Sequence, residues 1–213
     1  MTVPVPLLVF LHGLGQTPPL WQDQVTSLPP GTRAVAPWLE GLRPGKPADF
    51  DLERAADAVL AQLNRFGVDS VALAGTGLGA AVAVVAAGRS PDAVSHLVLS
   101  DLQPRAPKLA GLAQRLAVRT MPAGRLADAG LDRARMLRLV KAVSGIDLRP
   151  WLGAITAQSL LIAGGSDAAG TAAARELAEG LDGARVEIIP GAAAPVPTQS
   201  VEQYNRLLYD FLG

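Results

Sequence analysis

The sequence contains no cysteine and only two histidines, His12 and His96, which lie far apart along the chain. Without cysteine there are no disulfides and no thiol nucleophiles, and without clustered histidines the usual zinc sites are excluded. We therefore expect neither a metal nor another cofactor. His96 precedes an apolar run, which predicts a structural role at the end of the molecule away from any site.

The chain also lacks an excess of charge of either sign, because 19 basic residues are matched by 19 acidic ones. A neutral chain produces no field that would concentrate nucleic acid or draw the protein to an anionic membrane. The expected partner is a small-molecule substrate or ligand, with no nucleic acid and no membrane.

No apolar run is long enough to cross a bilayer. The first residues, MTVPVPLLVFLHG, have no basic start, and their apolar part is about half as long as a membrane span. This predicts neither a signal peptide nor a transmembrane helix, so a cytoplasmic location is expected.

What the sequence does contain is a regular alternation of short apolar runs and helical patterns. With 213 residues, 49% of them hydrophobic, the chain can fill one core, and we predict a single domain over 1–213. Apolar β-favouring runs that alternate with helices indicate an α/β fold with a mainly parallel sheet flanked by helices. The expected strands are 7–11, 33–36, one starting at 71, 95–100, 159–163 and 186–189, and the expected helices include one from Pro18, 51–66, one to 87, 171–181 and 200–212.

One stretch, VALAGTGLGAAVA, has a glycine pattern that predicts a strand turning sharply into a helix. Two kinds of site use such a turn. In the nucleophile elbow, Gly-x-Ser-x-Gly, the middle position belongs here to Gly77, between Gly75 and Gly79. In the dinucleotide fingerprint the pattern is met by Gly75, Gly77 and Ala80, with Asp101 placed to receive a ribose hydroxyl.

Four segments in this order resemble the α/β-hydrolase family over essentially the whole chain. LLVFLHGLG is similar to its strand and oxyanion turn, VALAGTGLGAAVA to its elbow, and LLIAGGSDAAG to the strand and loop that carry its acid. VEIIPGAAAPVPTQSVEQYNRLLYDFL is similar to its last strand, histidine loop and final helix. The resemblance implies the α/β-hydrolase fold with the first two strands missing and a small helical lid at about 103–150.

The resemblance also implies a damaged catalytic triad. Gly77 stands where the family has its serine, Ala194 where it has its histidine, and only the acid is matched, as Asp167. Without a hydroxyl and a base, neither acyl-enzyme formation nor its hydrolysis can run. The backbone oxyanion donors, which the resemblance places at Leu14 and Leu78, need no particular side chain and are expected to remain.

Several other residues are candidates for the site, each with a purely structural alternative. Asp101 and Asp167 both follow strands, so each is a candidate general base, while Asp101 could instead cap a loop or helix and Asp167 could be a remnant. His12 is either a structural hydrogen-bonding residue of the oxyanion turn or a base.

Three further residues could border the pocket. Thr76 could replace the lost serine, although a shift of the turn by one residue would bring Leu78 to a position that favours a small side chain. Trp21 and Trp38 follow strand ends and could either wall a pocket or pack in the core.

The functional expectation is a non-hydrolytic enzyme, of lyase, isomerase, dehydratase or cyclase type, acting on a carbonyl-containing small molecule, plausibly in bacterial specialised metabolism. The oxyanion turn would stabilise an enolate and a carboxylate would move the proton. The alternatives are an inactive ligand-binding or protein-interacting pseudoenzyme, an atypical hydrolase and a dinucleotide-binding protein.

Overall fold

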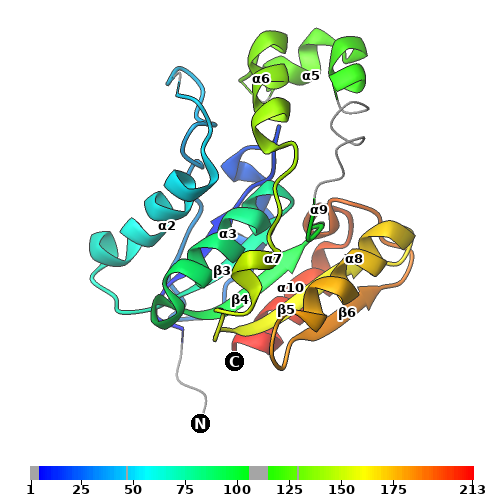
Figure 1. The fold of residues 1–213 in the computed structure, drawn as a ribbon. Helices are drawn as coiled ribbons and strands as arrows, with labels where there is room; N and C mark the ends of the chain where they lie inside the picture. Colours follow the sequence, from blue (N-terminus) through cyan, green and yellow to red (C-terminus); the bar gives the residue numbers. More distant parts are fainter. Residues whose placement is uncertain (1–4, 47, 106–114, 129) are drawn as a thin grey trace.

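The computed structural model describes residues 5–46, 48–105, 115–128 and 130–213, without the side chains of 123, 125 and 128. They form one six-stranded sheet in the order β2-β1-β3-β4-β5-β6 (Figure 1). Every neighbouring pair of these strands is parallel. This confirms the predicted α/β fold. The strands are β1 (Leu8–Leu11), β2 (Ala34–Val35), β3 (Val71–Thr76), β4 (Val94–Ser100), β5 (Gln158–Gly164) and β6 (Arg185–Ile189).

Helices cover both faces of this sheet. Figure 1 shows α2, α3 and α8 on one face, with α10 behind the sheet on the other. The helices are η1 (Pro18–Trp21), α1 (Gln22–Thr26), α2 (Leu52–Phe66), α3 (Leu78–Arg89), η2 (Pro91–Ala93), α5 (Ala123–Asp128), α6 (Arg133–Val143), α7 (Arg149–Leu152), α8 (Ala168–Glu179), α9 (Val196–Gln199) and α10 (Val201–Leu212).

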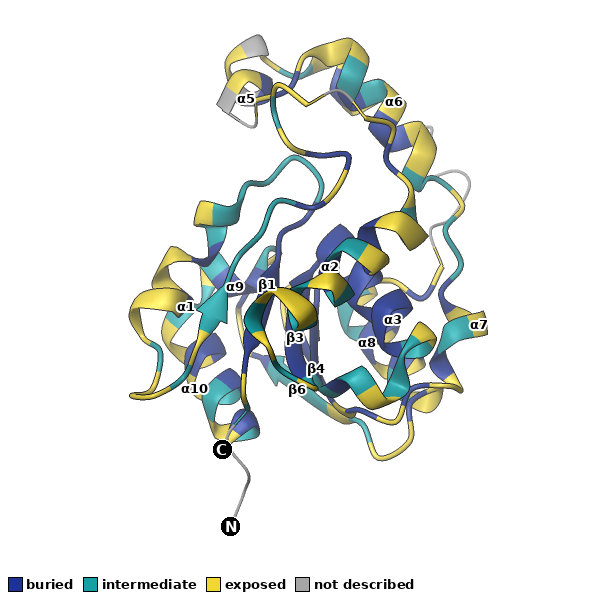
Figure 2. Cartoon of the chain, turned by 90° about the vertical axis from the view of Figure 1, so that its left-hand side faces the viewer, coloured by how far each residue is buried: buried dark blue, intermediate teal, exposed yellow. Residues whose placement is uncertain are grey.

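The side chains of each strand point alternately to the two faces of the sheet, and this divides the core into two clusters. Val9 and Leu11 of β1 belong to the cluster under α2 and α3, whereas Leu8 and Phe10 belong to the cluster with α10. Successive side chains of a strand point to opposite faces, so an apolar run without polar breaks is what a strand covered on both sides requires. Figure 2 shows the result, with β1, β3 and α3 in the dark blue of buried residues.

Capping residues decide where the predicted helices begin. The Asp51 carboxylate accepts a hydrogen bond from the Arg54 N–H at 2.8 Å, and α2 then runs to Gly67, which has φ +62°. Helix α8 begins at Ala168, three residues earlier than predicted, because Asp167 caps it. The helix expected from Pro18 is a 3-10 turn followed by the short α1, which ends at Thr26.

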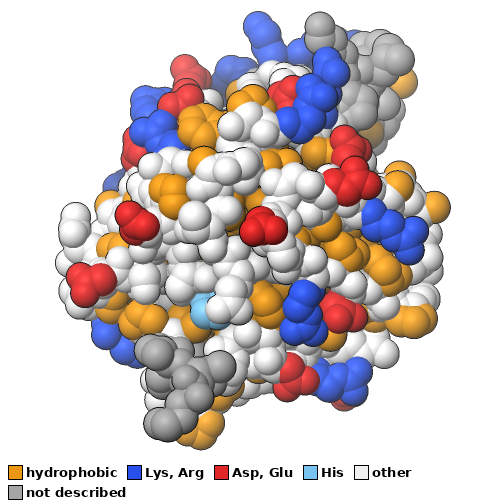
Figure 3. Space-filling view, turned by 60° about the horizontal axis from the view of Figure 1, so that its bottom comes forward, with side chains coloured by type: hydrophobic (Ala, Val, Ile, Leu, Met, Phe, Trp, Pro, Cys, Tyr) orange, Lys and Arg blue, Asp and Glu red, His pale blue; other side chains and the backbone are white. Residues whose placement is uncertain are grey.

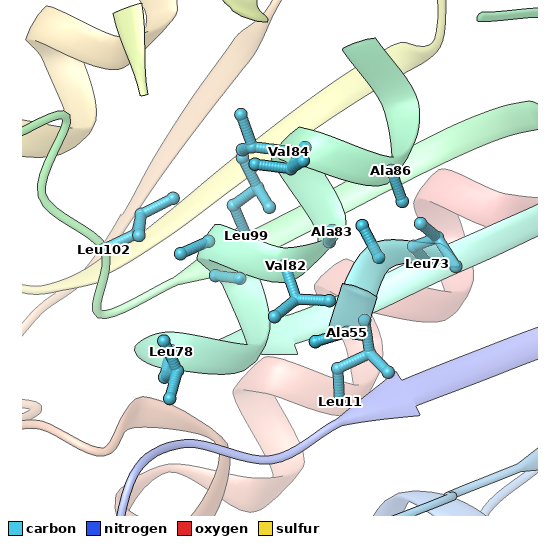
Figure 4. Close-up of a cluster of buried hydrophobic side chains, with 14 of the residues drawn as sticks. Leu11, Ala55, Leu73, Leu78, Val82, Ala83, Val84, Ala86, Leu99 and Leu102 are labelled. Carbon is cyan, nitrogen blue, oxygen red and sulfur yellow. The ribbon is translucent and has the colours of Figure 1, made fainter. Parts of the chain in front are cut away.

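The glycine turn brings α3 unusually close to the sheet. A Cβ on Gly75 would lie 2.6 Å from the Ala80 N atom, and a Cβ on Gly79 would lie 2.1 Å from the Leu11 carbonyl oxygen. Only residues without a side chain permit this approach. Figure 4 shows the result, with Val82 and Val84 of α3 packed among leucines of neighbouring strands.

A helical layer lies beyond the edge of the sheet at which Gly77 follows β3 (Figure 1). It contains α5 and α6, and part of the predicted lid, 106–114 and 129, lies outside the described residues. Arg135 joins α6 to the body, because its Nη2 donates to the carbonyl oxygens of Gly41, Arg43 and Lys46 at 3.1, 3.1 and 3.2 Å. An antiparallel bridge between Arg105 and Asp147 pairs the two ends of the lid segment.

Charges are interspersed on the surface shown in Figure 3, where acidic and basic side chains alternate with apolar ones. None of the helices among the described residues is long and apolar enough to span a membrane. A cytoplasmic location stays a prediction.

Candidate active site

Gly77 lies at the tip of the turn between β3 and α3. Its backbone has φ +54° and ψ −115°, and its N–H donates to the Ser100 carbonyl at 3.0 Å. A Cβ here would have room, since the nearest atoms are the Gly13 Cα at 3.9 Å and the Asp101 carbonyl oxygen at 4.0 Å. The elbow geometry that presents a side chain to the site is therefore present, and the side chain is absent.

A cavity of about 480 Å³ lies next to this turn. The lid contributes Val143, Ser144, Ile146 and Leu148 to its wall, so the lid does border the space above the glycine turn. Its volume is within the usual range for small-molecule sites. From the body, the lining includes Leu14, Gln16, Thr76, Leu78, Asp101 and Ala194.

The two expected oxyanion donors both border this cavity. Leu78 is the first residue of α3, and the N–H groups of a first helical turn have no partner within the helix. The preceding turn is fixed by Gln16, whose Oε1 accepts a hydrogen bond from the Gly13 N–H at 2.7 Å beside Leu14. Sequence reasoning did not single out Gln16; the signal was its position three residues after Gly13, the usual spacing of a side chain that bonds a turn N–H.

Asp101 is the acidic residue among the described residues that line the cavity. It directly follows β4 with φ +54°, the only such value for a non-glycine residue in the described chain. The Thr76 hydroxyl donates to its Oδ2 at 2.7 Å, and the Val196 N–H donates to the same oxygen at 3.1 Å. Burial raises the pKa of Asp101, the hydrogen bonds from Thr76 and Val196 lower it, and nearby Asp167 raises it again.

Asp167, which the resemblance predicts to be the counterpart of the acid, has a different environment. Its Oδ1 accepts a hydrogen bond from the Gly170 N–H at 2.9 Å and so caps α8. It is not among the residues that line the 480 Å³ cavity, but it borders, together with Asp101, a space of about 10 Å³. Of the two candidate carboxylates, the structure brings Asp101 to the main cavity.

His12 is held away from the cavity by the backbone. It is fully buried, its Nδ1 lies 3.0 Å from the Gly13 carbonyl oxygen, and its Nε2 accepts a hydrogen bond from the Leu39 N–H at 3.3 Å. An accepting Nε2 assigns the proton to Nδ1, and burial lowers the pKa of the ring. With both nitrogens engaged, the geometry favours the structural interpretation of His12.

Both tryptophans are placed outside the cavity wall. Trp21 is fully buried and stacks on Phe10 with ring centroids 4.9 Å apart, because the turn after β1 folds it under the sheet rather than toward the lid. Trp38 packs edge-on against His12, with centroids 5.2 Å apart. Part of the cavity wall comes instead from the lid, whose course was not readable from the sequence.

The described residues include no group of three or more histidine, cysteine, aspartate or glutamate side chains that could hold a metal ion. His96 lies at the start of β4, at the opposite end of the sheet, where it contacts Phe211 edge-on. The chemistry that the site can offer is one half-buried carboxylate and backbone donors that border the same cavity.

Comparison with known proteins identifies relatives over this whole arrangement. The sequence model of the Alpha/beta hydrolase family matches residues 8–206. A pimeloyl-[acyl-carrier protein] methyl ester esterase from Aromatoleum aromaticum is 39% identical over 100 residues, which is 46% of this chain and 38% of the esterase. The chain thus spans less than half the length of that relative in this match.

Solved structures with the same fold cover nearly the entire chain. An enol-lactonase from Burkholderia xenovorans LB400 superposes with a TM-score of 0.85 at 22% identity, covering 99% of this chain and 92% of its own. NosK from Streptomyces actuosus superposes with a TM-score of 0.80 at 24% identity, covering 97% of each chain. At these identities the likeness shows the fold alone.

Proposed function

Because the chain belongs to the α/β-hydrolase family, we propose that it is an enzyme that acts on a carbonyl-containing small molecule without forming an acyl-enzyme. The observation that carries this proposal is the position of Asp101, a half-buried carboxylate with a strained backbone that borders the cavity beside Gly77. Residues held in sparsely populated backbone conformations cluster at functional sites. The proposed reaction is non-hydrolytic, of lyase, isomerase, dehydratase or cyclase type.

In the proposed reaction, Asp101 removes a proton from the carbon next to the substrate carbonyl. The electrons of that C–H bond move to the carbonyl oxygen, and the N–H groups of Leu14 and Leu78 stabilise the enolate that forms. Donors of this kind contribute about 10²- to 10³-fold each. A carboxylate whose pKa is raised by burial is a stronger base than one in water, which suits it to this step.

The lining of the cavity supports a neutral substrate. Among the described residues that line it, Asp101 is the only charged one, and most of the others are apolar. A substrate carboxylate or phosphate inside the cavity would meet this negative charge, and none of the described lining residues is a cation that could balance it. The relatives' printed names, a methyl ester esterase and an enol-lactonase, describe proteins that act on ester or lactone carbonyls, which supports a carbonyl substrate here.

Hydrogen exchange tests the proton transfer without knowledge of the final product. Neutral ketones, esters and lactones that fit the cavity are incubated with the protein in D₂O, and deuterium next to the carbonyl is followed by NMR. We expect exchange above the uncatalysed rate for at least one class, abolished by Asp101→Asn. Saturable binding without exchange would instead support the inactive pseudoenzyme.

A second candidate is hydrolysis by a water molecule that Asp101 activates directly, and the esterase and lactonase relatives favour it. This route also has no covalent intermediate. It is distinguished by H₂¹⁸O, because direct water attack places one ¹⁸O atom in the product acid without labelling the protein, whereas the non-hydrolytic reaction releases no acid.

Ligand charge provides a further prediction. Of a methyl ester and the matching free acid, we expect the neutral ester to bind at least tenfold more tightly, because the carboxylate of the acid would be placed near ionised Asp101. Calorimetry at neutral pH measures both affinities. In Asp101→Asn the preference should shrink; an unchanged preference would show that Asp101 does not face the ligand.

Fluorophosphonate probes for serine hydrolases are expected to leave the protein unmodified, because position 77 carries no hydroxyl. Intact-mass spectrometry reports this directly. Gly77→Ser should still react poorly, since Ala194 supplies no imidazole, while Gly77→Ser with Ala194→His should react faster than either single variant. Stoichiometric labelling of the unmodified chain would require a nucleophile other than the elbow residue.

A further inference from the structure

Asp101 is surrounded by groups from every element that packs against it. Thr76 approaches from the end of β3, the Val196 N–H from α9, and Asp167 from the loop before α8. The Ser100 hydroxyl and Tyr204 of α10 are also close enough to influence the Asp101 carboxylate. Burial raises the pKa of Tyr204, so its phenol stays neutral and Asp167 is the remaining charged neighbour.

We propose that Thr76 and Asp167 are positioning residues that act on the reaction through Asp101, with the Thr76 hydroxyl holding the carboxylate in its working orientation and Asp167 facing it across a water-sized gap. This inference rests on the proposed function, in which Asp101 is the base. It gives Thr76 a role other than that of a substitute nucleophile.

The Thr76 side chain is well suited to orient a carboxylate. It is 1% exposed at the end of β3, and its β-branched side chain has little rotamer freedom. Its hydroxyl and the Val196 N–H both bond Oδ2, at 2.7 and 3.1 Å. The other oxygen, Oδ1, has only a 3.4 Å contact with the Val196 N–H, so Oδ1 is the oxygen left to accept a substrate proton.

Asp167 acts on the same carboxylate by charge rather than by a direct bond. Both residues border the space of about 10 Å³, which is close to the volume one water molecule needs. A second negative charge opposes the ionisation of Asp101, whereas the Thr76 hydrogen bond favours it. The two neighbours therefore shift the titration of Asp101 in opposite directions.

The two effects are measured by ¹³C NMR of the aspartate carboxyl groups over a pH titration, with the Asp101 signal assigned from its loss in Asp101→Asn. Thr76→Val keeps the shape of the side chain and removes the hydroxyl. In this variant the midpoint of the Asp101 titration should rise by about one pH unit, as expected for a lost hydrogen bond to a charged group. The matched variant Thr76→Ser keeps the hydroxyl and should keep the wild-type midpoint.

In Asp167→Asn, which retains a side chain able to cap α8, the midpoint should fall by a few tenths of a pH unit, since the partly exposed charge is screened. Added salt should reduce this second shift and leave the Thr76→Val shift unchanged. Where turnover is observed, the acidic limb of the pH–rate profile should move by the same amounts.

The proposal is overturned if the Asp101 midpoint is the same in Thr76→Val and Thr76→Ser, or if it does not fall in Asp167→Asn. The NMR titration needs no substrate, so a failure of the proposed reaction and a failure of this inference are separate results.

Discussion

Asp101→Asn is expected to lower kcat by roughly 10²- to 10⁴-fold while the protein stays folded, because the amide cannot accept the substrate proton. Asparagine fits this position well. It tolerates the φ of +54°, and its carbonyl oxygen can still accept the hydrogen bonds from Thr76 and Val196. Steady-state kinetics, or the rate of hydrogen exchange into the substrate, measures the loss.

The same substitution is expected to stabilise the fold at neutral pH. The folded-state pKa of Asp101 is raised, so this group's contribution to stability is complete below its unfolded pKa and is lost as the pH rises through the folded pKa. Asparagine removes this loss. The unfolding free energy of Asp101→Asn should exceed that of the wild type near neutral pH, and the difference should disappear in acid, as urea unfolding across pH would show.

Asp51→Asn is the matched control, since Asp51 is an exposed cap of α2 whose function asparagine can replace. It removes the same charge away from the cavity and should leave the kinetics unchanged. Turnover that survives Asp101→Asn within a few-fold would refute the carboxylate mechanism and leave the backbone donors and the shape of the cavity as the means of catalysis.

Gly79→Ala is expected to lower the unfolding free energy by more than about 3 kcal/mol, at the upper end of the cost of overpacking a core. The added Cβ would lie 2.1 Å from the Leu11 carbonyl oxygen and 2.7 Å from that of His12, both backbone atoms that cannot rotate away. For a chain of this size, such a loss corresponds to a fall in Tm of roughly 6–12 °C. Thermal unfolding followed by circular dichroism measures it.

Gly77→Ala is the comparison that separates crowding from backbone strain. Its Cβ would meet nothing nearer than 3.9 Å, so only the unfavourable φ of +54° remains, at about 1–3 kcal/mol.

At Gly79, which lies inside α3, alanine would also gain about 1 kcal/mol of helix propensity over glycine. If Gly79→Ala were neutral or stabilising, this gain would outweigh the clash, and α3 would not lie as close to β1 as the structure places it.

The sequence was sufficient for the features whose cause is local. The mostly apolar runs from 71 and over 159–163 predicted buried strands, which the structure has as β3 and β5. The alternate glycines from Gly75 predicted the turn because only glycine allows such a close approach. The cap at Asp167 is also local, since its partner Gly170 is three residues away, and this spacing was available to be read.

The choice between the two carboxylates was decided only by the tertiary structure. Asp101 and Asp167 both follow buried strands, and although the capping of α8 by Asp167 is local, nothing near Asp101 along the chain identifies it as the carboxylate that borders the cavity. The hydrogen-bond partners of Asp101 are Thr76, 25 residues away, and Val196, 95 residues away. The tautomer of His12 likewise depends on Leu39, 27 residues away. Local sequence determines the local backbone, and with it the elbow turn at Gly77. Proton affinity depends on burial and on hydrogen-bond partners, which come together only when distant strands pair.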